Sequence, residues 1–296
     1  MQPEGGGEMG RLLQVSDFVF GRTLRVLAKG LEALTPKNST VITRWLRPAE
    51  IQPGDEVCIF VAYAPGSHVP EHSLFHARAW ANAGFRVVVA VNTNHFDQDP
   101  DTSSLDFASG VLVRENRGYD FGAWASALSE LPTLKSASIV AIANDSMYGP
   151  LNSFRTMVDR ARSLDADVIG ATESTQVLHH FQSFLIFFKP AALRSSAFWK
   201  FWRGIRAGGR IIAVLRYELG LMRTMQRAGL RCAALFPCAD TRNPTLARWK
   251  ELVDQGFPYV KIALLRDNYY NVDLTGWEDV MRAHGYDPSL ALQKSG

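Results

Sequence analysis

The sequence predicts an α/β fold in which a mostly parallel, Rossmann-like sheet is flanked by helices. Two strand-length runs, VCIFVAY at 57–63 and FRVVVAVNT at 85–93, are almost wholly apolar. Such runs are typical of strands that are buried on both faces of a parallel sheet. An amphipathic, helix-length stretch at 70–83 lies between them and is closed by Gly84. A helix that joins two buried strands indicates a parallel pair with a right-handed crossover.

The alternation of strands and helices continues along the chain. GVLVREN at 110–116 predicts a third, shorter strand, and SIVAIA, which ends at Ala143, predicts a fourth because it is short, β-branched and free of charge. Later strands are expected at 166–173 (ADVIGATE), 183–190 (SFLIFFKP) and 230–237 (LRCAALFP). Further helices are expected at 122–131, 151–164, 198–202, 217–228, 244–255 and 277–283.

Composition excludes several classes of protein. The net charge of +3 is mild and no basic cluster is interleaved with aromatic residues, so no nucleic-acid partner is expected. No apolar stretch approaches the ~20 residues of a membrane span, and the first residues, MQPEGGGEMG, lack the apolar core of a signal peptide. Three cysteines, Cys58, Cys232 and Cys238, form no even framework, which favours buried thiols in a reducing compartment over a disulfide or zinc site. A cytoplasmic protein is expected.

The chain divides into a tail, an N-terminal extension and one α/β domain. We expect a disordered tail at 1–10, a helical extension at 11–50 and the domain, with a C-terminal helical extension, at 51–296. Residues 11–34 place apolar side chains at helical spacing, with Arg11, Arg22, Arg25 and Lys29 among them. This segment is interpreted either as an interfacial helix on an acidic membrane surface or as a helix packed on the domain or on a second copy in a homo-oligomer.

Residues 115–151 carry the strongest functional signal. Asn144, Asp145 and Ser146 follow the predicted strand that ends at Ala143, and ligands of open α/β sheets bind at this carboxyl edge. Asp145 is therefore a candidate ligand for a cation or a hydroxyl. The alternative is that Asp145 only shapes the following loop as an Asx-turn residue.

A polar turn precedes the helix expected from Gly122. Arg117 can hold a phosphate with a fork of donors, and the helix start adds backbone N–H groups for an anion. The turn also contains Asn116, Asp120 and close-approach glycines at 118 and 122. An anion-binding turn followed by a strand-end carboxylate suits a nucleotide diphosphate with a metal ion. Alternatively, Asp120 caps the helix, and Arg117 forms an ion pair with Glu115 or Asp120.

Other candidates have a structural interpretation that competes with a functional one. His72 and His76 would share a helix face, but the acid expected of a zinc pair is absent between them and Pro70 separates His68. Lys261 and Arg266 flank an apolar run and either close over a leaving diphosphate or only bound a buried segment. One aromatic group favours the hydrophobic core over a sugar platform: Phe181, Phe184, Phe187, Phe188 and Trp199.

Five stretches, in order, carry a family resemblance: ENRGYDFGAW, NDSMYGPL, HHFQSFLIFF, YELGL and GFPYVKIALLRDN…HGYDP. From about Val57 to the C-terminus the chain resembles the rhamnan synthesis protein F family of bacterial polysaccharide and lipopolysaccharide assembly. The resemblance implies a GT-A-like glycosyltransferase domain. Its implied reaction is transfer of a sugar, often a deoxysugar such as rhamnose, from a nucleotide-sugar donor to a glycan or lipid-linked glycan acceptor at the inner face of the cytoplasmic membrane.

The resemblance also implies residue roles. Asn144, Asp145 and Ser146 stand where GT-A enzymes carry an Asp-x-Asp metal motif. With one acid retained, Asp145 is the expected ligand of Mg²⁺ or Mn²⁺, and the missing acid argues against tight binding. Glu218, at the expected start of a helix facing the acceptor, is the implied general base of an inverting enzyme. Glu173 and His180 compete with it for this role. The implied donor site consists of Tyr63, Asn92, Asn116, Arg117, Gly118, Asp120, Asn144, Asp145 and Ser146.

Two rival functions are compared with glycosyl transfer. The incomplete metal motif favours a non-catalytic scaffold that binds glycan or synthase partners. A nucleotidyltransferase would instead need a Gly-rich loop with Lys or Arg after the first strand, and the loop here, AYAPGSHVPEH, has neither.

Overall fold

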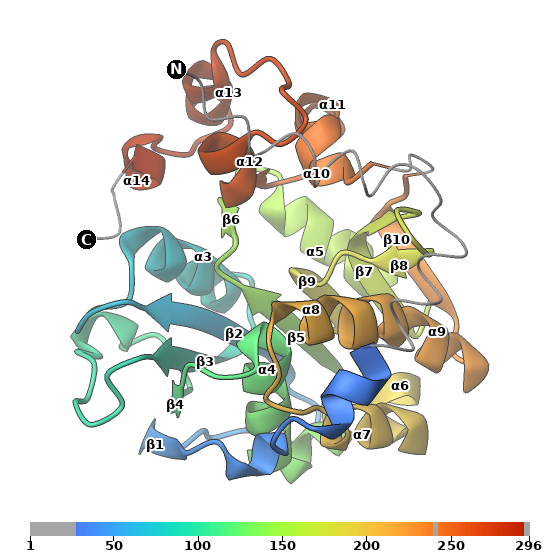
Figure 1. The fold of residues 1–296 in the computed structure, drawn as a ribbon. Coiled ribbons are helices and arrows are strands. Elements are labelled where there is room, and N and C mark those ends of the chain that lie inside the picture. The colour runs from blue at the N-terminus through green and yellow to red at the C-terminus, as the bar shows by residue number, and fades with distance from the viewer. Residues whose placement is uncertain (1–27, 239–241, 293–296) are drawn as a thin grey trace, which may run out of the picture.

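The computed structural model describes residues 28–238 and 242–292, and its centre is a nine-stranded sheet flanked by helices (Figure 1). The predicted α/β, mostly parallel architecture is confirmed. The strand order is β1-β4-β3-β2-β5-β9-β7-β10, with β8 paired to β7 alone. The strands are β1 (Thr43–Arg47), β2 (Glu56–Ala64), β3 (Arg86–Thr93), β4 (Gly110–Glu115), β5 (Ile139–Asn144), β7 (Val168–Ser174), β8 (His180–Phe181), β9 (Leu185–Phe188) and β10 (Cys232–Phe236).

The direction of the strands defines where a ligand site can form. β4, β3, β2 and β5 are parallel neighbours, and β7 and β10 form a second parallel pair. β9 runs antiparallel between β5 and β7. The chain passes from β2 outward to β3 and β4, then returns to β5 on the other side of β2. Connections therefore diverge between β2 and β5, and ligands of open α/β sheets bind at the carboxyl ends of strands at such a point.

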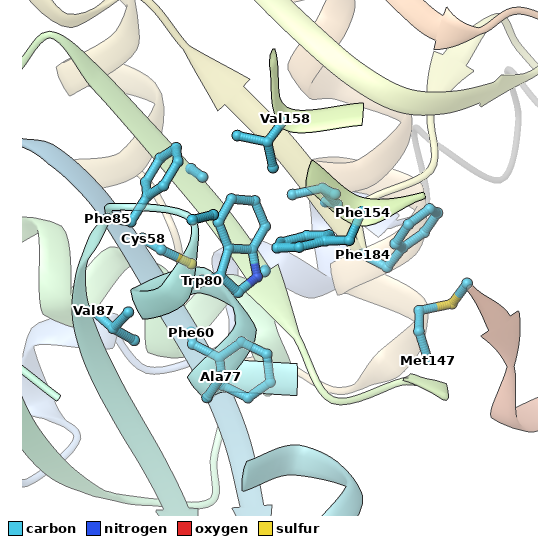
Figure 2. Close-up of a cluster of buried hydrophobic side chains, with 14 of the residues drawn as sticks. Cys58, Phe60, Ala77, Trp80, Phe85, Val87, Met147, Phe154, Val158 and Phe184 are labelled. Atoms are coloured by element: carbon cyan, nitrogen blue, oxygen red, sulfur yellow. The ribbon is translucent and has the colours of Figure 1, made fainter. Parts of the chain in front are cut away.

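Alternating side chains of β2 build the core on both faces of the sheet. Cys58 and Phe60 face a cluster that includes helices α3 (Glu71–Asn82) and α5 (Phe154–Ser163). Figure 2 shows part of this cluster, in which Trp80 packs its ring against Phe85 and Phe154. Val57, Ile59 and Val61 face the opposite side. The almost continuous apolar sequence of β2 is thus a consequence of helices on both faces.

The second face carries α4 (Tyr119–Glu130), α6 (Pro190–Arg194), α7 (Ser196–Arg203) and a long helical segment. That segment consists of α8 (Arg210–Ile212), the π-helical η4 (Ala213–Glu218) and α9 (Leu219–Arg227). Glu218 was expected at a helix start, and this expectation is wrong. The helix begins eight residues earlier, at Arg210, so Glu218 lies inside it and gains nothing from an N-terminal dipole.

The C-terminal residues form a smaller unit with its own core. Its elements are α10 (Pro244–Ala247), α11 (Trp249–Asp254), β11 (Val260–Lys261), α12 (Ile262–Asp267), α13 (Trp277–Ala283) and α14 (Ser289–Leu292). In Figure 1 these orange and red elements gather above β6 (Met147–Tyr148), with which β11 pairs. The helix expected at 244–255 is divided at Arg248, whose φ of −131° is not helical. The helix expected at 277–283 is confirmed as α13.

The described part of the 11–50 extension is not purely helical. Residues 28–33 are helical, a 3₁₀ turn, η1, covers Asn38–Thr40, and β1 pairs antiparallel with β4. Trp45 packs against the core on one face of the sheet and Leu46 against the core on the other. This strand went unpredicted because its partner, β4, is distant in sequence. The tail at 1–10 and most of the basic segment at 11–34 lie outside the described residues.

Two composition-based expectations can be compared with the structure. Cys58, Cys232 and Cys238 all have free thiols, and Cys58 and Cys238 are buried. Within residues 28–238 and 242–292, no helix combines the length and the apolar character needed to cross a bilayer.

Candidate functional site

Asp145 lies at the divergence point of the sheet, directly after β5. Its carboxylate Oδ2 accepts a hydrogen bond from the backbone N–H of Tyr63, at the end of β2, over 2.7 Å. Its own backbone N–H donates to the carbonyl of Val61 over 3.1 Å. The Asx turn proposed as the alternative role of Asp145 is made by Asn144, whose Oδ1 accepts from the N–H and the hydroxyl of Ser146. Asp145 is therefore not needed for that turn.

Asp120 is the second carboxylate of the site. Helix α4 begins at Tyr119, three residues before the predicted start, so Asp120 lies in its first turn. No side chain caps this helix, which removes the capping interpretation of Asp120. Instead, its Oδ2 accepts a hydrogen bond of 2.7 Å from Nδ2 of Asn144. Asn144 thus joins the two carboxylate-bearing segments.

Both carboxyl groups hold their protons more strongly than exposed aspartates do. Burial raises the pKa of Asp145 to about 7; the hydrogen bond from Tyr63 opposes this rise, and the charge of Asp120 adds to it. Burial also raises the pKa of Asp120 to about 6, against the hydrogen bond from Asn144 and with a contribution from Glu218. Two neighbouring carboxyl groups with raised pKa values, whose charges act on each other, are a physical indication of a functional site.

Glu218 joins this group from η4, which lies on the same face of the sheet as α4. The backbone N–H of Ser183 donates to its Oε1 over 3.3 Å. The charge of Glu218 shifts the pKa of both Asp120 and Lys261, so the three side chains lie close enough to interact electrostatically. Lys261 comes from β11 of the C-terminal unit. The segments that sequence analysis singled out at 120, 145, 218 and 261 are therefore brought together by the fold.

The two competing bases are engaged elsewhere. Nε2 of His179 lies 2.8 Å from a carboxylate oxygen of Glu173. His180 is buried, with Nδ1 2.6 Å from the carbonyl of Leu178 and Nε2 3.3 Å from the amide nitrogen of Gln182. In this arrangement Nδ1 donates and Nε2 accepts, so neither nitrogen is open to an acceptor hydroxyl. Neither residue shares a hydrogen bond with the carboxylates of the site within the described residues.

A row of polar side chains continues along the carboxyl edge. The amide of Asn94 donates to the hydroxyl of Tyr63 over 2.8 Å, and Asn116 donates to the carbonyl oxygen of Asn94 over 3.1 Å. These side chains stand at the ends of three adjacent parallel strands. Sequence analysis missed Asn94, although it follows the second predicted strand directly and the strand-end rule would have found it.

Several residues expected to bind a donor have close contacts within the protein. Asn92 is buried, and its Oδ1 accepts from Nη1 of Arg114 over 3.2 Å. A Cβ at Gly122 would lie 2.7 Å from Nη2 of Arg114, and one at Gly118 would lie 2.9 Å from Cα of Ala207. The two glycines therefore permit close packing within the protein. Gly118, with φ of 79°, also needs the left-handed conformation that glycine adopts without strain.

Arg117 lies in the same turn as Gly118, and its side chain is exposed. Among the described residues, it forms neither of the ion pairs considered for it, with Glu115 or with Asp120. Its guanidinium is therefore open to an anion at the rim of the site.

A buried arginine organises these contacts. Arg114 is fully buried and donates to Ser126 Oγ, Asn92 Oδ1, the carbonyl of Glu115 and Asn38 Oδ1. Burial lowers its pKa to about 10. The network ties the N-terminal segment, the sheet and α4 together beneath Asp120.

We expect Arg114→Met to destabilise the fold strongly. The change leaves two buried acceptors, Asn92 Oδ1 and Asn38 Oδ1, without a donor. Each such group costs ~1–3 kcal/mol, so we expect a total loss of about 3–5 kcal/mol. Urea unfolding measures the change, with Arg78→Met as the control because the Arg78 side chain is 47% exposed. A loss below about 1 kcal/mol, no larger than that of a typical surface substitution, would show that the network is dispensable.

The remaining candidates have structural roles. His76 is buried, its Nε2 lies 2.9 Å from the hydroxyl of Tyr259, and burial lowers its pKa to about 3. His72 packs edge-on against the ring of Tyr148. In the part of the chain that the structure describes, no three His, Cys, Asp or Glu side chains are grouped as a metal site. The four phenylalanines of the aromatic group, at 181, 184, 187 and 188, are buried in the core, as predicted.

Comparison with known proteins shows the family. A match to the family described as "Rhamnan synthesis protein F" covers residues 87–295. The chain belongs to the rhamnan synthesis protein F family. This membership indicates a function related to polysaccharide biosynthesis.

The curated relatives share less than a third of their aligned residues with this chain. "Virulence protein VirA" of Vibrio anguillarum is 28% identical, and the match covers 56% of this chain and 66% of that protein. "Uncharacterized protein y4gN" of Sinorhizobium fredii is 26% identical over 53% of this chain and 42% of its own length. A solved structure, A197 from STIV, covers 61% of this chain and 82% of its own, with 10% identity and a TM-score of 0.32, too slight a likeness to carry an argument. The chain thus spans less than two thirds of these curated relatives.

Proposed function

We propose that this member of the rhamnan synthesis protein F family is a glycosyltransferase that moves a sugar from a nucleotide diphosphate donor to a growing bacterial surface polysaccharide. One observation carries the proposal: Asp120 and Asp145, two carboxyl groups with raised pKa values, meet where the sheet connections diverge. Loss of solvent favours the neutral forms of two neighbouring carboxyl groups, so keeping both of them ionised costs stability. A bound cation, or a positively charged group of a substrate, would pair with the ionised carboxylates and offset this cost.

The residues present fit a divalent cation, Mg²⁺ or Mn²⁺, that is bound together with the donor. Mg²⁺ is commonly held by one or two protein carboxylates, substrate phosphates and waters, and needs no complete protein cage. Asp145 is the proposed ligand, with Asp120 beside it. A bound cation would supply charge to offset that of the departing diphosphate. Because a ligand carboxylate must be ionised, cation affinity should rise between about pH 6 and pH 8 as Asp120 and Asp145 lose their protons.

Glu218 is the proposed general base. It shares an electrostatic neighbourhood with Asp120 and Lys261, whereas Glu173 and His180 are engaged in other contacts. The carboxylate takes the proton of the acceptor hydroxyl as the oxygen attacks the anomeric carbon. The bond from that carbon to the diphosphate oxygen breaks with its electrons going to the leaving group, which inverts the configuration.

A panel of nucleotide sugars tests the proposal. The purified chain is incubated with UDP-, GDP- and dTDP-linked sugars, with Mn²⁺ or with EDTA, and release of nucleoside diphosphate and thermal stabilisation are measured. We expect at least one donor to stabilise the protein and to be hydrolysed or transferred. If the protein binds a glycan but no donor in any buffer, the scaffold function is correct and the transferase proposal is wrong.

A further inference from the structure

Lys261 enters the site on a strand that is fixed to the turn containing Asp145. In the β6–β11 pairing, Lys261 lies opposite Met147, two residues beyond Asp145. The backbone N–H of Ile262 donates to the carbonyl of Ser146 over 3.1 Å. The backbone of Lys261 is therefore held by the segment that carries the site carboxylate, although the two lie far apart in the sequence.

The ammonium of Lys261 is partly buried but lacks a close partner. No hydrogen bond or ion pair joins it to any of the described residues, while the charges of Glu218 and Asp120 act on it from nearby. Burial lowers the pKa of Lys261, those two carboxylates oppose this, and Arg210 adds to it. A buried cation without hydrogen-bond acceptors is unfavourable unless something else satisfies it.

Two other basic side chains in this protein, Lys189 and Arg266, have the partners that the Lys261 ammonium lacks among the described residues. Lys189 also loses solvent, but its ammonium donates to the carbonyls of Arg162 and Leu164. Arg266, one turn beyond Lys261, forms an ion pair of 2.7 Å with Asp267 and is 66% exposed. The expectation that Arg266 closes over a leaving group therefore has no support from its position. Lys261 differs from both because, within residues 28–238 and 242–292, no acceptor is hydrogen-bonded to its ammonium, while the charges of Glu218 and Asp120 act on it.

A second cation stands close to Lys261. Arg210 begins α8, its side chain is exposed, and its charge acts on both Lys261 and Asp267. It reaches the site from the helical layer, whereas Lys261 comes from the C-terminal unit. Two cations from two elements suit a ligand with two adjacent negative groups, and ammonium and guanidinium groups are the usual protein partners of phosphate.

We propose that Lys261, assisted by Arg210, binds the diphosphate of the donor and stabilises it as it leaves. This inference rests on the proposed glycosyltransferase function and adds the residues that hold the leaving group. It assigns a catalytic role to the C-terminal unit, which delivers Lys261. The attraction of Lys261 for Asp120 and Glu218 then keeps the site assembled before the donor binds.

Calorimetry with nucleoside diphosphates tests this role without relying on activity. UDP, GDP, dTDP and CDP, and the matching uncharged nucleosides, are titrated into wild-type protein, Lys261→Gln and Arg210→Gln. The control is Lys250→Gln, an exposed lysine of the same C-terminal unit. Because the nucleosides lack phosphates, their binding reports whether the rest of the site is intact. Thermal unfolding of each variant reports whether the fold is intact.

We expect Lys261→Gln to weaken binding of the preferred diphosphate about 10- to 100-fold, as for a lost hydrogen bond to a charged group, with nucleoside binding unchanged. Arg210→Gln should weaken it less, and Lys250→Gln not at all. Equal diphosphate affinity in wild type and Lys261→Gln overturns the inference and leaves the proposed function standing. If wild type binds none of the four diphosphates, both fail. If Lys261→Gln does not fold, the Arg210→Gln variant provides the test, because Arg210 is exposed. Unchanged diphosphate affinity in Arg210→Gln then overturns the inference.

Discussion

Replacing Glu218 with glutamine is expected to lower turnover about 10²–10⁴-fold, the usual contribution of a general base. Glutamine keeps the shape of glutamate and can still accept the hydrogen bond from the backbone of Ser183. It cannot take a proton from an acceptor hydroxyl at neutral pH. Donor affinity, measured by calorimetry beside turnover, should therefore stay near its wild-type value.

Glu173→Gln is the matched control for this experiment. Glu173 is also a glutamate and lies on β7, where it pairs with Phe181 of β8. Its carboxylate contacts His179 rather than Asp120 or Asp145. We expect its loss to change turnover little. If donor affinity falls together with activity in Glu218→Gln, Glu218 is a donor ligand and the base lies elsewhere. If Glu173→Gln is the inactive variant, the assignment of the base is wrong.

Replacing Asp145 with asparagine is expected to lower transfer about 10²–10³-fold, as loss of a group that stabilises transition-state charge does. Asparagine can still accept the 2.7 Å hydrogen bond from Tyr63, so the turn should keep its shape. Turnover with Mn²⁺ and with EDTA separates two roles of the carboxylate. A defect that appears in Mn²⁺ but not in EDTA indicates a cation ligand, whereas near-native turnover in both buffers would refute the assignment.

The same variant should be more stable than wild type at alkaline pH. The pKa of Asp145 is about 7 in the folded protein, against about 3.9 for an unfolded aspartate. The folded state therefore binds the proton more tightly, and wild type loses stability as pH rises from about 4 to 7. Asparagine carries no proton to lose. At face value the difference between the two pKa values corresponds to about 4 kcal/mol of stability, and solvent around the half-buried Asp145 reduces this. We therefore expect Asp145→Asn to gain on the order of 2 kcal/mol over wild type at pH 8, and little at pH 4.

Urea unfolding at these two pH values measures the difference, and Asp254→Asn, an exposed substitution, controls for general charge effects. A variant that is less stable than wild type at pH 8 would show that Asp145 holds the fold together. A variant that is inactive and more stable would show that the carboxylate is kept for function, because functional sites retain groups that cost stability.

Sequence patterns were sufficient for the core of the sheet and for the edge that carries the site. Val57, Ile59 and Val61 on one face of β2, with Cys58 and Phe60 on the other, are apolar because helices cover both faces. That requirement acts on each residue locally, so it can be read from the sequence. The rule that ligands meet the carboxyl ends of parallel strands then located Asp145 before any contact was known.

Helix boundaries were less well predicted than strands. Gly122 marked the expected start of α4, but the helix begins at Tyr119, after the left-handed Gly118. Glu218 was expected to begin a helix that in fact begins at Arg210. In both places the residues before the predicted start are held by packing against distant segments. Gly118, for example, lies against Ala207, and no local pattern reports that contact.

By itself, the sequence determined the α/β class, the buried strands and the candidate carboxylates, because these depend on residue type and short-range periodicity. Only the tertiary structure decided which candidates lie close together. The Tyr63–Asp145 hydrogen bond spans 82 residues, and Lys261 reaches the site through the pairing of β11 with β6. The same contacts set the environment that raises the pKa of Asp145 and leaves Lys261 without a hydrogen-bond partner among the residues that the structure describes. Burial and charge proximity are properties of the folded chain, so the chemistry of this site exists only once distant segments have met.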